Sequence, residues 1–243
     1  MSIHKSVIIE DGAIISKGVT IEPFSIIRKN VEIGENTFIG SHCDLGFGND
    51  KKLVIGKKSL IRSHNLIYGG SWFKEMFETG HHVTIREGIK AGLNFRLGTL
   101  GDLQGDSDFG DYVRMHSNVN LAKGTKVGNF VWISKFVNTT NDPHPPSKIE
   151  MNVTINDYVF VATNCVILPG VNIGKHCLIG AFSKVSSSTD PGYLYSGNPA
   201  KRICQTNKIR LKDGSNKSAY PWTSHHHVGY PQEVISNWIN SSS

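Results

Sequence analysis

The sequence has no long apolar run, and it also lacks the cysteine patterns of metal-binding and disulfide-rich proteins. No stretch approaches the roughly 20 apolar residues of a membrane-spanning helix. The polar start, residues 1–5, has no apolar segment of the kind found in secretory signal peptides. The four cysteines show no metal or redox spacing. We therefore expect a cytoplasmic protein without a membrane partner, a disulfide framework or a bound metal.

Long runs of basic residues are missing as well, although the chain is basic overall. It carries 26 Lys and Arg against 20 Asp and Glu, which gives a net charge of +6, and such a surface attracts anionic partners. Through the repeats, the basic residues are scattered singly and are not interleaved with aromatic residues, as a nucleic-acid groove requires. We therefore expect no nucleic-acid partner, whereas nucleotide and coenzyme phosphates fit the charge.

A repeat of six residues dominates the chain. A mostly aliphatic marker recurs every six positions in three runs, which extend over residues 9–45, 55–139 and 155–185. Small or β-branched residues recur four positions after many of these markers, so each repeat has two inward positions. A period of six excludes an amphipathic helix, whose apolar face recurs at three and four residues. Short strands joined by tight turns remain.

Three repeats would form one triangular coil, in which equivalent residues stack every 18 positions at a spacing of about 4.8 Å. The counted repeats predict about nine such coils. The register slips at Asn49 and Asp50, and a longer interruption falls between Asp142 and Asn152. The pattern predicts an all-β fold, a parallel β-helix over residues 1–188 with a long loop near residues 140–152.

After Lys201 the repeat ends, and the remaining residues are rich in aromatics and turns. We expect residues 189–243 to form a small extension that caps the open end of the column, because that end exposes a strand edge and apolar interior. Cys43, Cys165 and Cys177 fall at small-residue positions of the repeat and are expected to be buried thiols.

The C-terminal repeats carry a recognisable signature. Residues 166–174, 179–181 and 197–201 resemble the C-terminal motif of the left-handed β-helix acyltransferases with hexapeptide repeats. The resemblance extends from Ile9 to about Val185. It implies a left-handed coil, a homotrimer, and clefts between adjacent columns that bind an acceptor and acetyl-CoA or another acyl-CoA. It also implies main-chain contacts to the coenzyme arm and cations for its phosphates, from Ala162, Ala181, Lys184, Lys201 and Arg202.

The loop that begins at Thr140 contains the most informative polar residues. Three prolines between Asp142 and Ser147 stiffen it and hold Asn141, Asp142 and His144 away from the packed coil. Long loops in repeat proteins usually carry binding residues, although an ordinary polar turn has the same composition. We assign the catalytic role to these three residues.

Residues spaced by 18 define a column beside this loop, formed by Glu87, Gly105, Lys123 and Asn141. The gap at Gly105 could admit a ligand, but a solvated ladder of charges explains the column equally well. Many lipid and sugar acyltransferases of this fold have a catalytic histidine at the position that Lys123 occupies here. A lysine is a poor general base near neutral pH, so that analogy is weak.

Together with residues 81–86 and 114–118, the loop most resembles N-acyltransferases that act on the 3-amino sugars of nucleotide-linked deoxyhexoses. The resemblance implies a nucleotide-sugar substrate for surface polysaccharide or lipopolysaccharide synthesis. It implies substrate contacts from His81, His82, Glu87, Arg114, His116 and Lys123.

Three alternatives stay open. The His144-Pro145 pair is also similar to galactoside and maltose O-acetyltransferases, in which this histidine is the general base. An alcohol needs such a base, whereas an amine needs only placement, and we favour the amine. His81, His82 and His116 raise the possibility of a zinc carbonic anhydrase, although the family's pair of histidines five residues apart is missing. The non-enzyme alternative is a trimeric scaffold.

Overall fold

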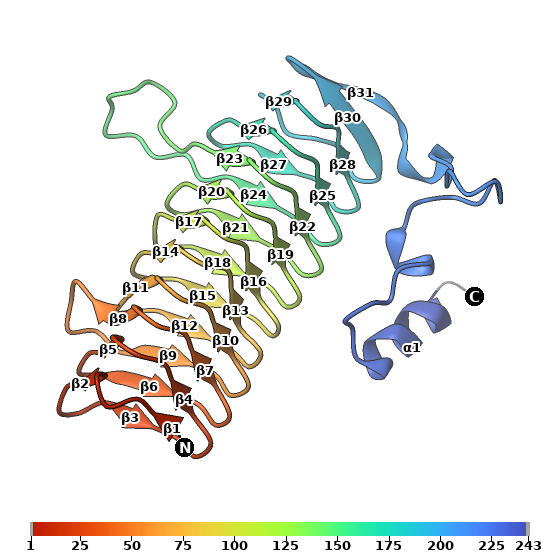
Figure 1. Ribbon diagram of the computed structural model, residues 1–243. Coiled ribbons are helices and arrows are strands. Elements are labelled where there is room, and N and C mark those ends of the chain that lie inside the picture. Colours follow the sequence, from red (N-terminus) through yellow and green to blue (C-terminus); the bar gives the residue numbers. More distant parts are fainter. Residues whose placement is uncertain (1, 242–243) are drawn as a thin grey trace.

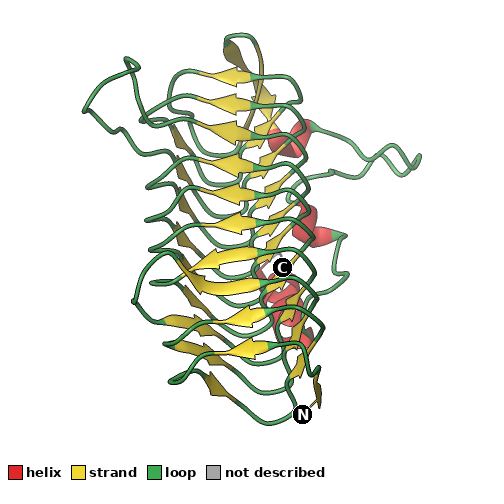
Figure 2. Cartoon of the chain, turned by 60° about the vertical axis from the view of Figure 1, so that its left-hand side comes forward, coloured by secondary structure: helices red, strands yellow, loops and turns green. Residues whose placement is uncertain are grey.

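The computed structural model describes residues 2–241. Short strands, most of them two residues long, wind into a triangular column whose three sides are parallel sheets (Figure 1, Figure 2). This confirms the predicted all-β parallel β-helix. We call the sheets A, B and C in the order in which the chain first enters them.

Sheet A consists of β1 (Ser2–Ile3), β4 (Thr20–Ile21), β7 (Phe38–Ile39), β10 (Leu60–Ile61), β13 (Glu78–Thr79), β16 (Arg96–Leu97), β19 (Arg114–Met115), β22 (Trp132–Ile133), β25 (Phe160–Val161), β28 (Leu178–Ile179), β30 (Tyr193–Gly197) and β31 (Ala200–Gln205). Sheet B consists of β2 (Ile8–Ile9), β5 (Ile26–Ile27), β8 (Asp44–Phe47), β11 (Leu66–Tyr68), β14 (Thr84–Ile85), β17 (Asp102–Leu103), β20 (Asn120–Leu121), β23 (Asn138–Thr139), β26 (Val166–Ile167) and β29 (Lys184–Val185). Sheet C consists of β3 (Ile14–Ile15), β6 (Val31–Ile33), β9 (Leu53–Ile55), β12 (Trp72–Phe73), β15 (Lys90–Ala91), β18 (Asp108–Phe109), β21 (Lys126–Val127), β24 (Thr154–Ile155) and β27 (Asn172–Ile173).

The column has about eleven turns, because sheet A contains eleven parallel strands from β1 to β30. The estimate of nine was low, since β1 and β30 lie outside the runs of markers. Partners in neighbouring turns are 18 residues apart, as in the pairing of Arg96 with Arg114. The spacing grows to 22 where Ile33 pairs with Ile55, and to 28 where Val127 pairs with Ile155. These are the two interruptions that the sequence predicts.

The markers of the repeat fill the interior of the column. Ile27, Ile39 and Ile61 are fully buried, and stacked phenylalanines fill part of the interior, where the Phe73 and Phe77 ring centroids are 4.0 Å apart. Ile9 is 41% exposed because it lies in the open first turn. A strictly repeated inward position thus buries an apolar side chain in each turn except at that end.

The predicted burial of the three cysteines is confirmed. Cys43, Cys165 and Cys177 are buried free thiols, and each Sγ donates a hydrogen bond to a main-chain carbonyl oxygen. Burial raises the pKa of the Cys43 thiol to about 11.

At the corners of the column, one residue in most turns adopts a left-handed conformation with positive φ. We name the corners A–B, B–C and C–A after the sheets that they join. Side chains at these positions stack along the column. At the C–A corner the stack consists of Tyr112, Phe130, Tyr158 and His176, with ring centroids 4.9 to 5.2 Å apart.

The C-terminal residues are arranged differently from the prediction. Strands β30 and β31 form an antiparallel hairpin at the end of sheet A, so this part lies at the open end as expected. From Thr206 the chain turns back along the C–A corner (Figure 1, Figure 2). It forms the 3-10 helices η1 (Thr206–Lys208) and η2 (Trp222–Ser224) and the helix α1 (Gln232–Ser241).

We call residues 206–241 the strap. Its Trp222, Tyr230 and Trp238 are buried with Tyr112 and pack against Phe130. The prediction that residues 189–243 cap the column is therefore wrong for the strap, which covers the flank. The stacked aromatic rings of this corner offer the strap an apolar surface to pack against. Within residues 2–241, no helix is both long and apolar enough to cross a bilayer.

Candidate active site

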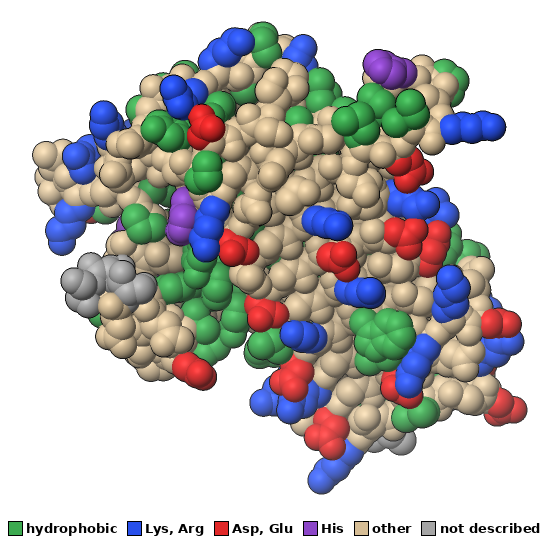
Figure 3. Space-filling view, turned by 180° about the vertical axis from the view of Figure 1, so that it is seen from behind, with side chains coloured by type: hydrophobic (Ala, Val, Ile, Leu, Met, Phe, Trp, Pro, Cys, Tyr) green, Lys and Arg blue, Asp and Glu red, His purple; other side chains and the backbone are tan. Residues whose placement is uncertain are grey.

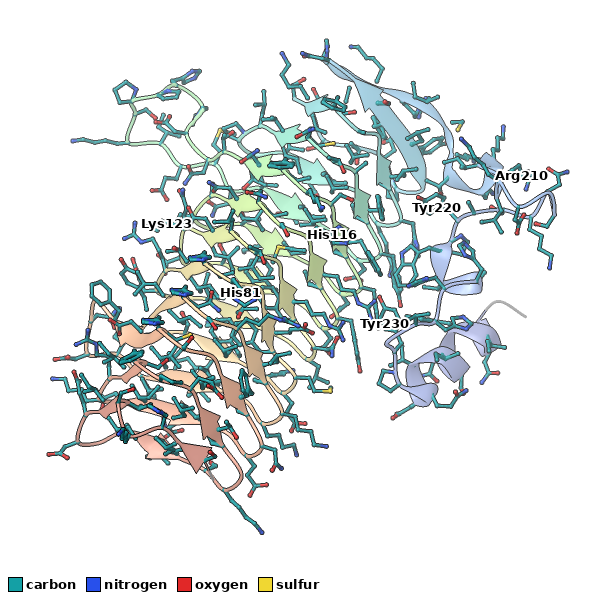
Figure 4. All side chains as sticks on the ribbon, viewed as in Figure 1. His81, His116, Lys123, Arg210, Tyr220 and Tyr230 are labelled. Carbon is teal, nitrogen blue, oxygen red and sulfur yellow. The ribbon has the colours of Figure 1, made fainter. Side chains whose placement is uncertain are left out.

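The structure divides the predicted acceptor and catalytic residues among three places on the column. The B–C corner carries Glu87, Lys123, Asn141, Asp142 and His144, the A–B corner carries His81, His82 and His116, and sheet A carries Arg114. Figure 4 shows Lys123 on the side from which the loop projects, and Tyr220 and Tyr230 of the strap on the opposite side. A single column does not bring these groups together.

The loop of residues 140–152 is organised by Asp142. Its Oδ1 accepts hydrogen bonds from the main-chain N–H of His144 at 2.9 Å and from the Ser147 hydroxyl at 2.6 Å. Its Oδ2 accepts a third from the Ser147 N–H at 2.8 Å. These bonds hold the pKa of Asp142 below its ordinary value, so the carboxylate is charged at neutral pH. The first role of Asp142 is therefore to fix the loop that carries the exposed His144.

The column of residues below the loop is present as predicted. The Asn141 side-chain amide donates to the Lys123 carbonyl oxygen at 3.4 Å, and Lys123 Nζ lies 3.5 Å from an Asp106 carboxylate oxygen. A Cβ on Gly105, at φ +100°, would lie 2.9 Å from the Glu87 carbonyl oxygen. This glycine is thus required by backbone geometry, and no ligand is needed to explain the gap.

A groove of about 390 Å³ lies over the A–B corner. It contains Arg62, Glu78, Arg96, His81, His116 and Lys135. The Glu78 carboxylate pairs with both guanidinium groups, at 2.8 Å to Arg62 and 3.4 Å to Arg96. Three cationic side chains against one carboxylate leave the groove with an excess of positive charge, which suits an anionic ligand. We call it the A–B groove.

His116 is the histidine of this groove best suited to proton transfer. Its ring lies edge-on to Trp132, with centroids 6.1 Å apart. Partial burial, and then the charge of Lys135, lowers the pKa of His116. The imidazole is therefore neutral near pH 7 and can accept a proton. A Cβ on Gly98 would lie 2.5 Å from the His116 main-chain carbon, so the turn below His116 approaches it closely.

The histidines proposed for zinc binding have different surroundings. His82 stacks on His64, which stacks on His42, with ring centroids 4.7 and 4.9 Å apart. His81 and His116 face the groove instead. Within residues 2–241, no three His, Cys, Asp or Glu side chains are grouped so that they could hold a metal ion.

Arg114 was predicted to bind substrate, but the structure places it apart from the loop and the A–B groove. Its side chain is 8% exposed and lies beneath the strap, where it donates to the carbonyl oxygens of Val228 and Gly229. Its guanidinium carbon lies 4.1 Å from the Tyr230 ring centroid and 5.0 Å from that of Trp132. The outward face of sheet A at this turn is covered, so Arg114 anchors the strap.

The residues predicted for the acyl donor lie toward the C-terminal end of the column. Ala162 and Ala181 are at the A–B corner, but the Ala162 N–H already donates to the Ile179 carbonyl oxygen at 2.9 Å. Lys184 and Lys201 are exposed. Arg202 lies 3.1 Å from the Asp190 carboxylate and over the Tyr193 ring at 4.9 Å. Lys184 and Lys201 are thus the more accessible cations for a phosphate.

Sequence reasoning missed Arg62, Arg96 and Lys135 of the A–B groove. A signal for Lys135 was present, because it stands 54 residues, or three turns of 18, after His81. Arg62 had the same signal, because it stands 54 residues before His116. Arg96 had none, since its distances from His81 and His116 are not multiples of 18.

Two segments of the chain, residues 12–43 and 148–187, match the family described as bacterial transferase hexapeptide (six repeats). Among curated proteins, a putative acetyltransferase of Schizosaccharomyces pombe is 35% identical over 85 residues, which is 32% of this chain and 41% of that protein. A putative acetyltransferase of Saccharomyces cerevisiae is 34% identical over 116 residues, 44% of this chain and 58% of that protein. The chain thus spans about half the length of these relatives.

Solved structures of similar shape include a UDP-N-acetylglucosamine O-acyltransferase of Moraxella catarrhalis, with a TM-score of 0.44, 18% identity, and coverage of 100% of this chain and 91% of that one. Another is a mutant of an N-acyltransferase from Bacillus cereus in complex with dTDP and coenzyme A, with a TM-score of 0.40, 17% identity, and coverage of 74% and 91%. Residues 12–43 and 148–187 therefore carry the repeats of the bacterial transferase hexapeptide family, and both segments lie within one continuous parallel β-helix.

Proposed function

We propose that this protein transfers a short acyl group, such as acetyl, from coenzyme A to the amino group of a nucleotide-linked amino-deoxy sugar. The sugar would serve surface polysaccharide synthesis, such as that of lipopolysaccharide. The proposal is supported by the hexapeptide repeats and by relatives whose names describe acetyltransferases. The strongest support is that the column has two half-sites on different corners. One is the fixed loop with His144, and the other is the cationic A–B groove with His116.

Each half-site is open on its own. The His144 side chain is exposed at the end of the loop, and the groove is shallow and lies on a convex corner, whereas small-molecule sites are concave. In the homotrimer that we propose, the loop of one subunit lies against the A–B groove of its neighbour. Each cleft would then hold His144 and His116 together with Arg62, Arg96 and Lys135.

The chemistry needs little more than placement. The sugar amine attacks the thioester carbonyl carbon, the carbon–sulfur bond breaks, and coenzyme A leaves as a thiolate. The nitrogen loses one proton, which a neutral imidazole accepts and can pass to the thiolate. Holding both substrates in one cleft supplies most of the rate increase, and the cations of the groove would hold substrate phosphates.

A second candidate is O-acyl transfer to a sugar hydroxyl. The lowered pKa of His116 favours it, because a hydroxyl needs a base that is neutral at the working pH. In this case His116→Ala or His144→Ala should reduce kcat by on the order of 10² to 10⁴. With an amine acceptor the same variants should be much milder, because an amine can lose its proton to solvent or to the thiolate.

Mixed assemblies test the shared cleft. Asp142→Ala releases the loop, and Lys135→Ala weakens the groove, so each variant alone should have low activity. Co-expressed subunits of the two variants should recover part of it, because some clefts then combine an intact loop with an intact groove. A mixture no more active than the average of its parents would contradict a site shared between subunits. Co-expressing each variant with itself provides the control.

A further inference from the structure

The strap closes an aromatic pocket over sheet A that has no part in the acyl-transfer chemistry. The pocket has a volume of about 250 Å³, and Trp132, Phe160, Tyr220, Trp222 and His226 form its walls. The Trp132 ring lies edge-on to those of Trp222 and His226, with centroids 6.1 and 5.5 Å apart. Pockets for whole small ligands measure about 300 to 1,000 Å³. This one fits a single planar ring system and leaves the rest of a ligand outside.

Trp222 lines this pocket and carries a buried indole N–H. The residue separates the pocket from a second cavity of about 230 Å³, which it lines together with Tyr158 and Tyr220. Its indole Nε1 is buried and has no hydrogen-bond partner within the described residues. Leaving a buried N–H unpaired costs free energy.

Positive charge gathers directly beside the pocket. Residues 209–219 form a projecting hairpin, in which the Leu211 N–H donates to the Lys217 carbonyl oxygen at 2.9 Å and the Ala219 N–H donates to that of Ile209 at 2.8 Å. The hairpin and the residue before it carry Lys208, Arg210, Lys212 and Lys217, all exposed. Figure 3 shows this cluster of Lys and Arg side chains at the upper left.

The hairpin leaves these cations available for a ligand. Its acidic residue, Asp213, accepts hydrogen bonds from the N–H and hydroxyl of Ser215. The hairpin runs straight into Ala219 and Tyr220, which line the pocket. A ring in the pocket would therefore bring anionic groups attached to it close to several cations.

The pocket is held in shape from below. Arg114 anchors the strap through the carbonyl oxygens of Val228 and Gly229 and through the Tyr230 ring. Partial burial lowers the pKa of His226, and the positive charge of Arg114 lowers it further. The His226 wall is thus neutral near pH 7, and like an aromatic ring it can pack against a planar base.

We propose that this strap pocket binds the planar base of a nucleotide, whose phosphates are held by the cations of the 209–219 hairpin. Aromatic walls next to a cluster of cations are the combination that recognises a base joined to phosphates. This inference rests on the proposed function, because the proposed acyl transfer identifies which nucleotide would reach the pocket. That source is either the base of the sugar nucleotide or the adenine nucleotide of coenzyme A.

Calorimetry on the full chain can test this without any acyl transfer. The probes are UDP, dTDP and adenosine 3′,5′-bisphosphate, each at low salt. Phe160→Ala removes one wall, and we expect it to weaken binding about 5- to 150-fold, the usual effect of removing one stacked ring. Arg210→Ala with Lys212→Ala removes two cations without touching the pocket and should weaken binding and flatten its salt dependence. Lys5→Ala with Lys17→Ala, two exposed cations at the far end of the column, makes the same charge change and should have no effect.

Binding of the pyrimidine nucleotides alone would assign the pocket to the acceptor, and binding of the adenosine probe alone would assign it to the coenzyme. The proposal is wrong if no probe binds, or if neither the wall variant nor the hairpin variant weakens binding. If Phe160→Ala fails to fold, the test rests on whether Arg210→Ala with Lys212→Ala weakens nucleotide binding. Nucleotide binding without any acyl transfer would retain the pocket and reject the proposed reaction, so the two failures can be told apart.

Discussion

Replacing Arg114 by methionine should release the strap while leaving the column folded. The variant keeps the length and much of the apolar stem of the side chain, but it loses the hydrogen bonds to the Val228 and Gly229 carbonyl oxygens and the contact with Tyr230. A desolvated cation–π contact contributes about 2 kcal/mol. Hydrogen bonds from a charged group contribute about 1.5 to 3 kcal/mol in net terms.

These gains are offset in part, because the charged group was desolvated to make them. Burial lowers the pKa of Arg114, which is the sign of that cost, and an apolar replacement avoids it. We therefore expect docking of the strap to weaken by about 2 to 4 kcal/mol. At about 1.4 kcal/mol per factor of ten, the strap should open roughly 30 to 700 times more often.

Amide hydrogen exchange measures this directly. Protection of residues 206–241 should fall by that factor, while strand amides of sheets B and C keep theirs, because they lie outside the contact with the strap. Arg96→Met is the matched control, since Arg96 occupies the same face one turn earlier and pairs with Glu78 instead. Unchanged protection of the strap in Arg114→Met, or an equal loss in Arg96→Met, would refute the assignment of Arg114 as the anchor.

Three further predictions concern the donor, the pH profile and the thiols. Lys201→Ala with Arg202→Ala should raise the KM for acyl-CoA with little change in kcat, and an unchanged KM would reject the placement of the donor phosphates. If His116 is the base, its lowered pKa keeps the imidazole unprotonated to lower pH. The kcat/KM for a hydroxyl acceptor should then stay level down to a pH of about 6.5 and fall only below that pH. A fall in kcat/KM that begins well above a pH of about 6.5 would show that another group is the base. A thiol reagent should label Cys204 in the folded protein and leave Cys43 unreacted, because Cys43 is buried and its pKa is raised to about 11, and fast labelling of Cys43 would contradict the packing.

The column was predictable because the residues that specify it are close together in the sequence and recur with a fixed period. One inward aliphatic residue per six residues specifies the strand, the turn and the stacking together, so Ile27 or Ile61 could be placed from spacing alone. The site is different, because it depends on which corner each residue occupies. His116 and Lys123 are only seven residues apart, yet they lie on different corners of the column.

The strap shows a second limit of the sequence. Its residues have no period, and their positions are decided by contacts with residues about 100 positions away, such as that of the Trp132 indole N–H with the Tyr230 hydroxyl at 3.1 Å. Arg114 was consequently placed in the substrate site. Similarly, Asp142 was assigned a catalytic role, but hydrogen bonds within the loop occupy both of its oxygens. The role of Asp142 toward the acceptor stays a prediction.

The central claim, that this column transfers an acyl group to a sugar amine, is tested most directly by one acceptor screen. Purified protein is incubated with acetyl-CoA and a set of UDP- and dTDP-linked amino sugars, each beside its hydroxyl counterpart, and both free thiol and product mass are followed. We predict that thiol release depends on an amino sugar and matches the gain of one acetyl group, with no turnover of the hydroxyl counterparts. Efficient turnover of a hydroxyl sugar that collapses in His144→Ala or His116→Ala would overturn N-acylation, and no thiol release with any acceptor would contradict the account as a whole.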